Sequence, residues 1–185
     1  RALDIIRDEH RALAAVLRAM RFVVRGIRAG TLEPDFRLLS AFLDYIVRLP
    51  EDCHHPKEDQ VLFPRVRATC PAAIPILDEL ERQHANGGRH VQDLILSLIH
   101  FQAVGRAGRD RFCELADAYV EFHWAHIEIE ERDLLPLIKD ALTPETWAEI
   151  DAAFAANADP WGKAGSEFAE LFSRMKREGV SCGRT

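Results

Sequence analysis

The sequence has no long apolar run, few cysteines and no excess of positive charge. No apolar run approaches the roughly 18 residues needed to cross a bilayer, so we expect no membrane association. The net charge of −6 gives no reason to expect nucleic acid as a partner. The four cysteines form no C-x-x-C pair, which favours reduced thiols over a zinc or disulfide framework. No signal peptide is visible, so we expect a cytoplasmic protein.

Helical spacing of apolar residues runs through nearly the whole chain, and no strand pattern competes with it. The chain has 185 residues, 48% of them hydrophobic, which suits one soluble domain with a core. Turn-forming residues separate four periodic stretches, at 26–34, 69–75 and 105–108. We therefore predict an all-α fold: an up-down-up-down four-helix bundle over residues 1–140 and a short C-terminal helical extension over 141–185, packed on the bundle.

Prolines predict two local features of these helices. Pro50 and Pro56 remove backbone donors within the second helix, so we expect a kink or bulge just before His54. In the extension, Thr143-Pro144-Glu145 has the pattern of a helix start, with threonine as the cap and proline in the first turn. That helix should run to about residue 156, and residues 166–176 should form another.

A histidine-rich motif occurs twice, 72 positions apart. The segment His54–Pro64 reads HHPKEDQVLFP, and His126–Pro136 reads HIEIEERDLLP. Aligned on the prolines, both contain His-x-x-x-Glu. On a helix this spacing places an imidazole and a carboxylate one turn apart on the same face, where they can clamp one metal ion. Two such clamps in one chain predict a dinuclear metal site.

Two single histidines extend the duplication, because Glu9-His10 recurs as Gln83-His84 74 positions later. His10 and His84 take positions where the apolar seam of a helix would normally continue. Burying such polar groups without a metal would cost on the order of 1–3 kcal/mol each. Carboxylate-bridged metal sites inside four-helix bundles are built from ligands projected inward by facing helices. Imidazole and carboxylate together suit Fe, Mn or Zn.

These elements resemble those of the hemerythrin-like, HHE cation-binding domains. The resemblance rests on D-E-H near the start, H-H-P-K-E-D-x-x-L-F-P, Q-H, and H-I-x-x-E-E-x-x-L-L-P. It covers about residues 3–140, and the tail is similar to the extension of a bacterial subgroup. It implies an oxo- or hydroxo-bridged di-iron centre with histidine terminal ligands and two bridging carboxylates, with Zn or Mn as substitutes. Carried over by position, the ligands are His10, His54, Glu58, His84, His126 and Glu130.

The chain departs from this family pattern at one ligand position. Oxygen-carrying hemerythrins have a second histidine one turn after the third-helix ligand, where this chain has Gly87 and Gly88. His90 is rotated about 240° from that ligand and cannot substitute for it. His123 lies level with the two glycines if neighbouring helices run antiparallel, so it is a candidate seventh ligand. The alternative is that His123 lies at the rim and the metal keeps an extra water.

Four further polar residues lie near the motifs. We expect His55 to be a neighbour of the ligands or a helix-interface group, because it lies about 100° round the helix from His54. We expect Glu131 to form a surface salt bridge. Tyr119 should be a core tyrosine bonded to a backbone carbonyl, the alternative being donation to a bound oxygen species. His100 lies too far along its helix to join the site.

The expected site suits redox chemistry with oxygen. An open di-iron(II) pair reacts with O2 by giving up two electrons, and a lining of Leu, Ile, Val and Phe favours binding over turnover. We therefore predict O2 binding, for oxygen carriage or for oxygen, redox or iron sensing. The alternative is an enzyme that degrades peroxide or nitric oxide at the same centre. A weaker option is a metal-stapled structural or partner-binding bundle. The expected partner is thus O2, another small diatomic or peroxide, and the oligomeric state stays open.

Overall fold

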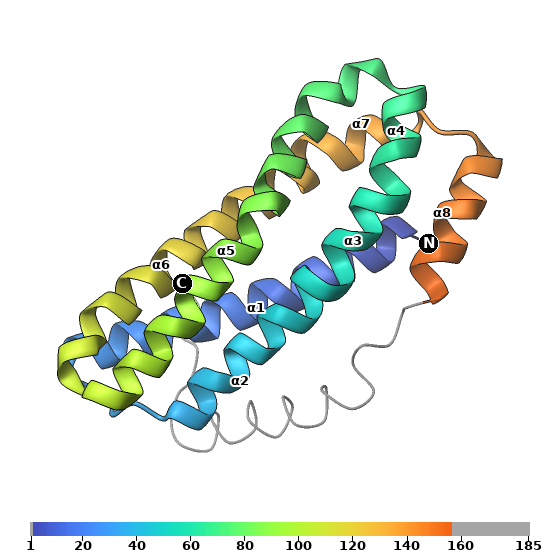
Figure 1. Cartoon of the computed structure of the whole chain (residues 1–185). Coiled ribbons are helices and arrows are strands. Elements are labelled where there is room, and N and C mark those ends of the chain that lie inside the picture. The colour runs from blue at the N-terminus through green and yellow to red at the C-terminus, as the bar shows by residue number, and fades with distance from the viewer. Residues whose placement is uncertain (1, 157–185) are drawn as a thin grey trace.

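The computed structural model describes residues 2–156, and all regular structure in this range is helical (Figure 1). The α-helices are α1 (Ala2–Ala29), α2 (Phe36–Ile46), α3 (His55–Lys57), α4 (Phe63–Thr69), α5 (Ile74–Val104), α6 (Arg106–Ile129), α7 (Leu135–Lys139) and α8 (Pro144–Ala156). Wider π-helical segments are η1 (Val47–His54), η2 (Glu58–Leu62) and η4 (Glu130–Leu134), and η3 (Pro71–Ala73) is a 3₁₀ turn. The predicted all-α class is confirmed for the described residues.

The helical segments join into four long rods that lie side by side (Figure 1). The first rod is α1 and the third is α5. Helices α2 to α4 follow one another through η1 and η2 and form the second rod, and α6, η4 and α7 form the fourth. Helix α1 contacts α2, α2 contacts α5, α5 contacts α6, and α6 contacts α1. The four rods therefore share one interior, into which side chains of all four project.

The connections between rods are short. Asp35 caps α2, because its side chain accepts hydrogen bonds from the backbone N–H groups of Arg37 and Leu38. Gly105 alone separates α5 from α6, and its φ of +61° suits glycine. The expected connection at 105–108 is therefore too long. Gly108 lies inside α6, where a Cβ atom would stand 2.7 Å from the Cα of Phe101.

The π-helical segments lie at the two duplicated motifs. In each one a backbone N–H bonds the carbonyl five residues earlier: His55 to Pro50, Phe63 to Glu58, and Leu135 to Glu130. The first confirms the bulge expected before His54, and the other two were not predicted. A five-residue step shifts the following side chains round the helix axis relative to an α-helix. Arguments from ideal α-helical angles therefore fail next to these turns.

The hydrophobic core has two parts. One cluster fills the end of the bundle that contains the connections α1–α2 and α5–α6, and the other lies at the opposite end beneath α8. In the first three rods, the histidines and carboxylates of the motifs lie between residues of the two clusters; in the fourth, Ile127 of the first cluster follows His126, and Glu130 lies between the clusters. The polar side chains are thus enclosed by apolar packing along the bundle axis.

Helix α8 confirms the predicted start at Thr143, whose Oγ1 accepts a hydrogen bond of 3.3 Å from the N–H of Thr146. Ile150 and Phe154 are fully buried, and α8 packs on α1. The helix expected at 166–176 lies outside the described residues. The proposed division at residue 140 stays a prediction.

Among the described residues, no helix combines the length and apolarity required to cross a membrane. Cys53, Cys70 and Cys113 are free thiols, as expected, and Cys182 lies outside the described range.

Candidate metal centre

Six buried side chains from all four rods meet in the middle of the bundle. They are His10 of α1, His54 and Glu58 at the junctions of η1, α3 and η2, His84 of α5, His126 of α6 and Glu130 of η4. Each of these side chains is at most 5% exposed. The structure therefore brings together the six residues that the duplicated motif and the family resemblance singled out.

The six side chains form two groups that share both carboxylates. Within each group, ligand atoms lie within 4.8 Å of one another; the groups are His10, His54, Glu58 and Glu130, and Glu58, His84, His126 and Glu130. The Nε2 atoms of His10 and His54 are 3.1 Å apart, and those of His84 and His126 are 3.3 Å apart. Two bonds of about 2.1 Å at a right angle would place ligand nitrogens about 3 Å apart. The observed spacing therefore fits two neighbouring ligands on one ion.

Each of these four histidines has a hydrogen-bond partner at its other nitrogen. The pairs are His10 Nδ1–Glu131 (2.8 Å), His54 Nδ1–Glu9 (2.7 Å), His84 Nδ1–Asp59 (2.7 Å) and His126 Nδ1–Gln83 (2.9 Å). With Nδ1 donating to an oxygen, the lone pair of Nε2 is left facing the interior. Metal-bound histidines are oriented by such partners, which also make the imidazole a better donor.

The partner residues extend the internal duplication. Glu9 and Gln83, each just before a single histidine, hold the histidine of the clamp in their own half of the chain. Asp59 and Glu131, each just after a clamp glutamate, hold the single histidine of the other half. The sequence pattern located Glu9-His10 and Gln83-His84 but did not predict these contacts. Glu131 also forms the expected salt bridge, with Arg7 at 3.5 Å.

The two shared carboxylates are poorly satisfied by the protein. Glu130 Oε2 lies 2.9 Å from His10 Nε2, yet neither oxygen of Glu130 accepts a hydrogen bond of normal geometry from the described residues. The same holds for Glu58 Oε2. Burial and the neighbouring Glu130 carboxylate raise the pKa of Glu58 well above its usual value. A cation between the two carboxylates would favour the ionised form of both.

Burial and the neighbouring carboxylates also shift the pKa values of the histidines. Burial lowers the pKa of His10, but Glu130 and Glu131 outweigh burial and raise it to about 9. Burial lowers the pKa of His126 to about 4, despite the nearby Glu130. Neutral imidazoles beside ionised carboxylates are the state that binds a metal ion, and protons compete with the ion for these groups.

Glu51 occupies the space beside Gly87 and Gly88 of the third rod. One expectation from the sequence was that the imidazole of His123 would fill this space. A Cβ atom on Gly87 would stand 3.0 Å from Glu51 Oε1. His123 is fully buried, and its Nε2 lies 3.1 Å from the hydroxyl of Tyr119, which pairs with this imidazole and not with a backbone carbonyl as expected. His123 belongs to neither group described above.

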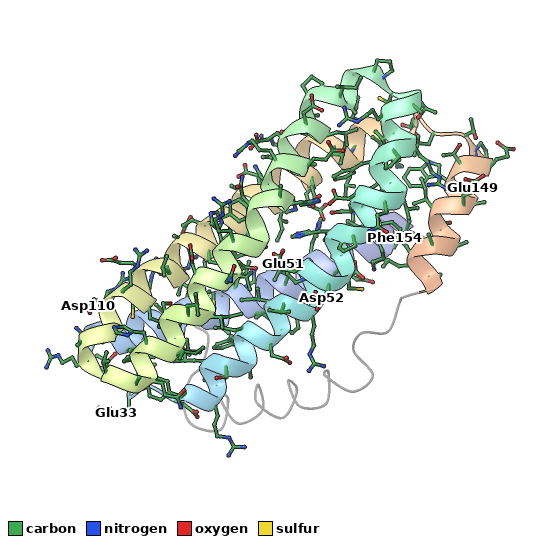
Figure 2. All side chains as sticks on the ribbon, in the orientation of Figure 1. Glu33, Glu51, Asp52, Asp110, Glu149 and Phe154 are labelled. Atoms are coloured by element: carbon green, nitrogen blue, oxygen red, sulfur yellow. The ribbon has the colours of Figure 1, made fainter. Side chains whose placement is uncertain are left out.

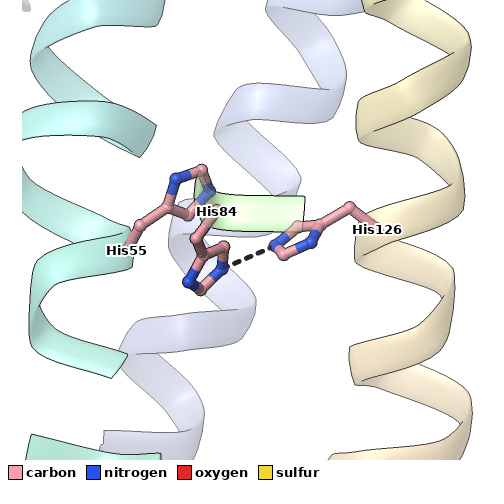
Figure 3. A group of neighbouring side chains, drawn as sticks. All are labelled: His55, His84 and His126. Atoms are coloured by element: carbon pink, nitrogen blue, oxygen red, sulfur yellow. Dashed lines mark hydrogen bonds between the residues drawn. The ribbon is translucent and has the colours of Figure 1, made fainter. Parts of the chain in front are cut away.

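His55 lies inside the cluster, although helical angles had placed it on another face (Figure 3). One of its ring nitrogens lies within 4.8 Å of ring nitrogens of His84 and His126. Its ring stacks on that of His84 with centroids 4.1 Å apart. His55 directly follows the π-helical segment η1, where ideal α-helical angles do not apply. The H-H dipeptide and Pro50 were the only sequence signals of this.

The buried side chain of Lys57 contacts the glutamate that orients His54. Lys57 Nζ donates a hydrogen bond of 2.7 Å to Glu9, whose other oxygen bonds His54. The ammonium group also lies 5.1 Å from the ring centroid of Phe154. Phe154 is labelled on α8 in Figure 2. Helix α8 therefore covers the charged group that neutralises Glu9.

The comparisons with known proteins agree with this centre. The family model described as hemerythrin HHE cation binding domain matches residues 1–138. The searches of curated proteins and of solved structures gave no match.

Proposed function

The chain belongs to the hemerythrin HHE cation-binding family, and from that premise we propose that it holds a pair of iron ions and binds O2 reversibly, for carriage or for sensing. The coarser part of this proposal, cation binding, follows from the family and from the clustered donors. The proposal of a pair of ions is supported by one observation: two pairs of inward-facing histidine Nε2 atoms surround two shared carboxylates. Two ions bridged by carboxylates suit this donor set.

We also propose the up-down-up-down order for the four rods. The closed ring of contacts between successive rods supports it. So do the connections, since a single residue joins α5 to α6. Short connections of this kind join antiparallel neighbours.

The proposed ligands divide between the ions. His10 and His54 would hold one ion, His84 and His126 the other, and Glu58 and Glu130 would reach both. A mixed nitrogen and oxygen donor set suits iron, and Zn or Mn would be held by the same residues. An iron(II) pair supplies the two electrons needed to bind O2.

The protein contributes orientation and exclusion of water. The partners at the Nδ1 atoms fix each imidazole, so little reorganisation is needed when the ions bind. Apolar clusters close the bundle on both sides of the site. Such an enclosure limits the water and protons that can reach the site.

Glu51 favours a second candidate, breakdown of peroxide or nitric oxide. Its carboxyl group lies at the edge of the cluster, 3.9 Å from His55 Nδ1 and 4.0 Å from His123 Nε2. Its Oε1 has no hydrogen-bond partner among the described residues. An acid–base group beside the metals is what turnover requires and what a carrier excludes.

One experiment separates the two candidates. The protein is loaded with iron(II) without oxygen, and O2 and hydrogen peroxide are then added in separate samples. Reversible binding predicts a charge-transfer band with O2 that disappears when the gas is removed and returns when it is added again. Steady evolution of oxygen from peroxide, abolished in a Glu51→Gln variant, would instead establish the enzyme. A Glu114→Gln variant, at an exposed position of α6, is the matched control.

A further inference from the structure

His55 is the one histidine of the cluster with no partner at either ring nitrogen among the described residues. It is 4% exposed, so neither nitrogen is well placed to bond bulk water. A buried polar group left unpaired costs on the order of 1–3 kcal/mol. We propose that His55 is a metal ligand, the third histidine of the ion held by His84 and His126. This inference rests on the dinuclear site proposed above.

The geometry is that of the other ligands. The other four histidines face a polar side chain with Nδ1 and the interior with Nε2. His55 has the same arrangement in a looser form, because its Nδ1 faces Glu51 Oε1 at 3.9 Å. Nε2 is then the nitrogen available to the ion. Figure 3 shows His55 extending from α3 to the imidazoles of His84 and His126.

His55 is also where the duplication of the site breaks down. The offset of 72 positions that relates His54 to His126 and Glu58 to Glu130 relates His55 to Ile127, which cannot bind a metal. The two ions are therefore unequal. One has two histidines and the other three, each with the same two carboxylates. The ion held by His10 and His54 keeps more open positions, and exogenous small molecules should bind to it.

His123 does not compete for this role. Its Nε2 pairs with the Tyr119 hydroxyl, and the ring centroids of His55 and His123 are 6.0 Å apart. The space beside Gly87 is filled by the Glu51 carboxylate and not by the His123 ring. The seventh ligand therefore comes from the second rod and not from the fourth.

The test uses Co(II) alone as the probe, with wild type, His55→Ala and His123→Ala. Co(II) content is measured per chain, and proton NMR then counts the strongly shifted, exchangeable imidazole N–H signals of coordinated histidines. We expect two ions and five signals in wild type. The His55 variant should show four signals, an altered visible spectrum and at least about 10-fold weaker binding of one ion, and added imidazole should restore the spectrum. The His123 variant should keep five signals.

Four signals in wild type, or five in the His55 variant, would overturn the assignment while leaving the dinuclear site intact. Fewer than two Co(II) ions per chain in wild type would instead overturn the proposed function. Folding is checked by circular dichroism. If His55→Ala does not fold, His55→Gln replaces it, and the count in wild type decides by itself.

Discussion

Replacing Glu58 by glutamine tests whether the two shared carboxylates hold metal. The amide keeps the size of the side chain but removes the charge that two ions would share. We expect the variant to lose most of its metal and to unfold at a lower temperature than metal-loaded wild type. Because binding energy to a preformed site is folding energy, removing the metal with a chelator should produce the same effect in wild type.

The size of the effect follows from the unsatisfied oxygens. Glu58 Oε2 and both oxygens of Glu130 are buried without hydrogen bonds from the described residues. At about 1–3 kcal/mol for each unsatisfied atom, metal removal should lower the free energy of unfolding by several kcal/mol. That is a large share of the roughly 5–15 kcal/mol of an ordinary domain. At about 2–4 °C per kcal/mol for a chain of this size, Tm should fall by roughly 10–20 °C.

The assay combines metal analysis with thermal unfolding followed by circular dichroism, with and without chelator. Glu114→Gln is the control for loss of a carboxylate, and His100→Ala is the control for loss of a histidine outside the cluster. Both should keep two ions per chain and the wild-type Tm. If Glu58→Gln retains both ions, or if metal-free and metal-loaded wild type melt together, the reasoning is refuted.

Three further substitutions follow from individual contacts. Lys57→Met leaves the buried Glu9 carboxylate without its ammonium partner and should lower stability by about 3–5 kcal/mol in urea unfolding; an unchanged midpoint would contradict the buried pair. A Cβ atom on Gly88 would make only an ordinary contact of 4.0 Å with Glu51 Oε2, so Gly88→Ala should raise stability by about 0.5–1 kcal/mol through helix propensity. Gly87→Ala crowds Glu51 Oε1 at 3.0 Å, so its gain in thermal stability should be smaller than that of Gly88→Ala. Equal gains would show that the carboxylate moves away freely.

Sequence pattern alone was sufficient for the helical class and for the meeting of six side chains. The spacing of apolar residues is a local property of each helix. It can therefore be recognised in the sequence without knowing which helices pack against one another. The duplicated His-x-x-x-Glu pairs and the single histidines lie at buried seam positions, and a bundle has one interior for them to share. The helix start at Thr143 could likewise be predicted from the sequence, because capping depends on residues within one turn.

Only the tertiary structure determined which side chains surround the six predicted ligands. Ideal α-helical angles turned His55 away from the site, but its ring lies beside those of His84 and His126, directly after a π-helical segment. The gap at Gly87 suggested an imidazole from the fourth rod, but a carboxylate from the second rod occupies it. The oxygens that orient the four histidines come from other rods, between 25 and 121 positions away in the chain. Contacts of this kind depend on how rods are rotated and aligned against one another. Local spacing carries no information about either, so only the packed bundle determines them.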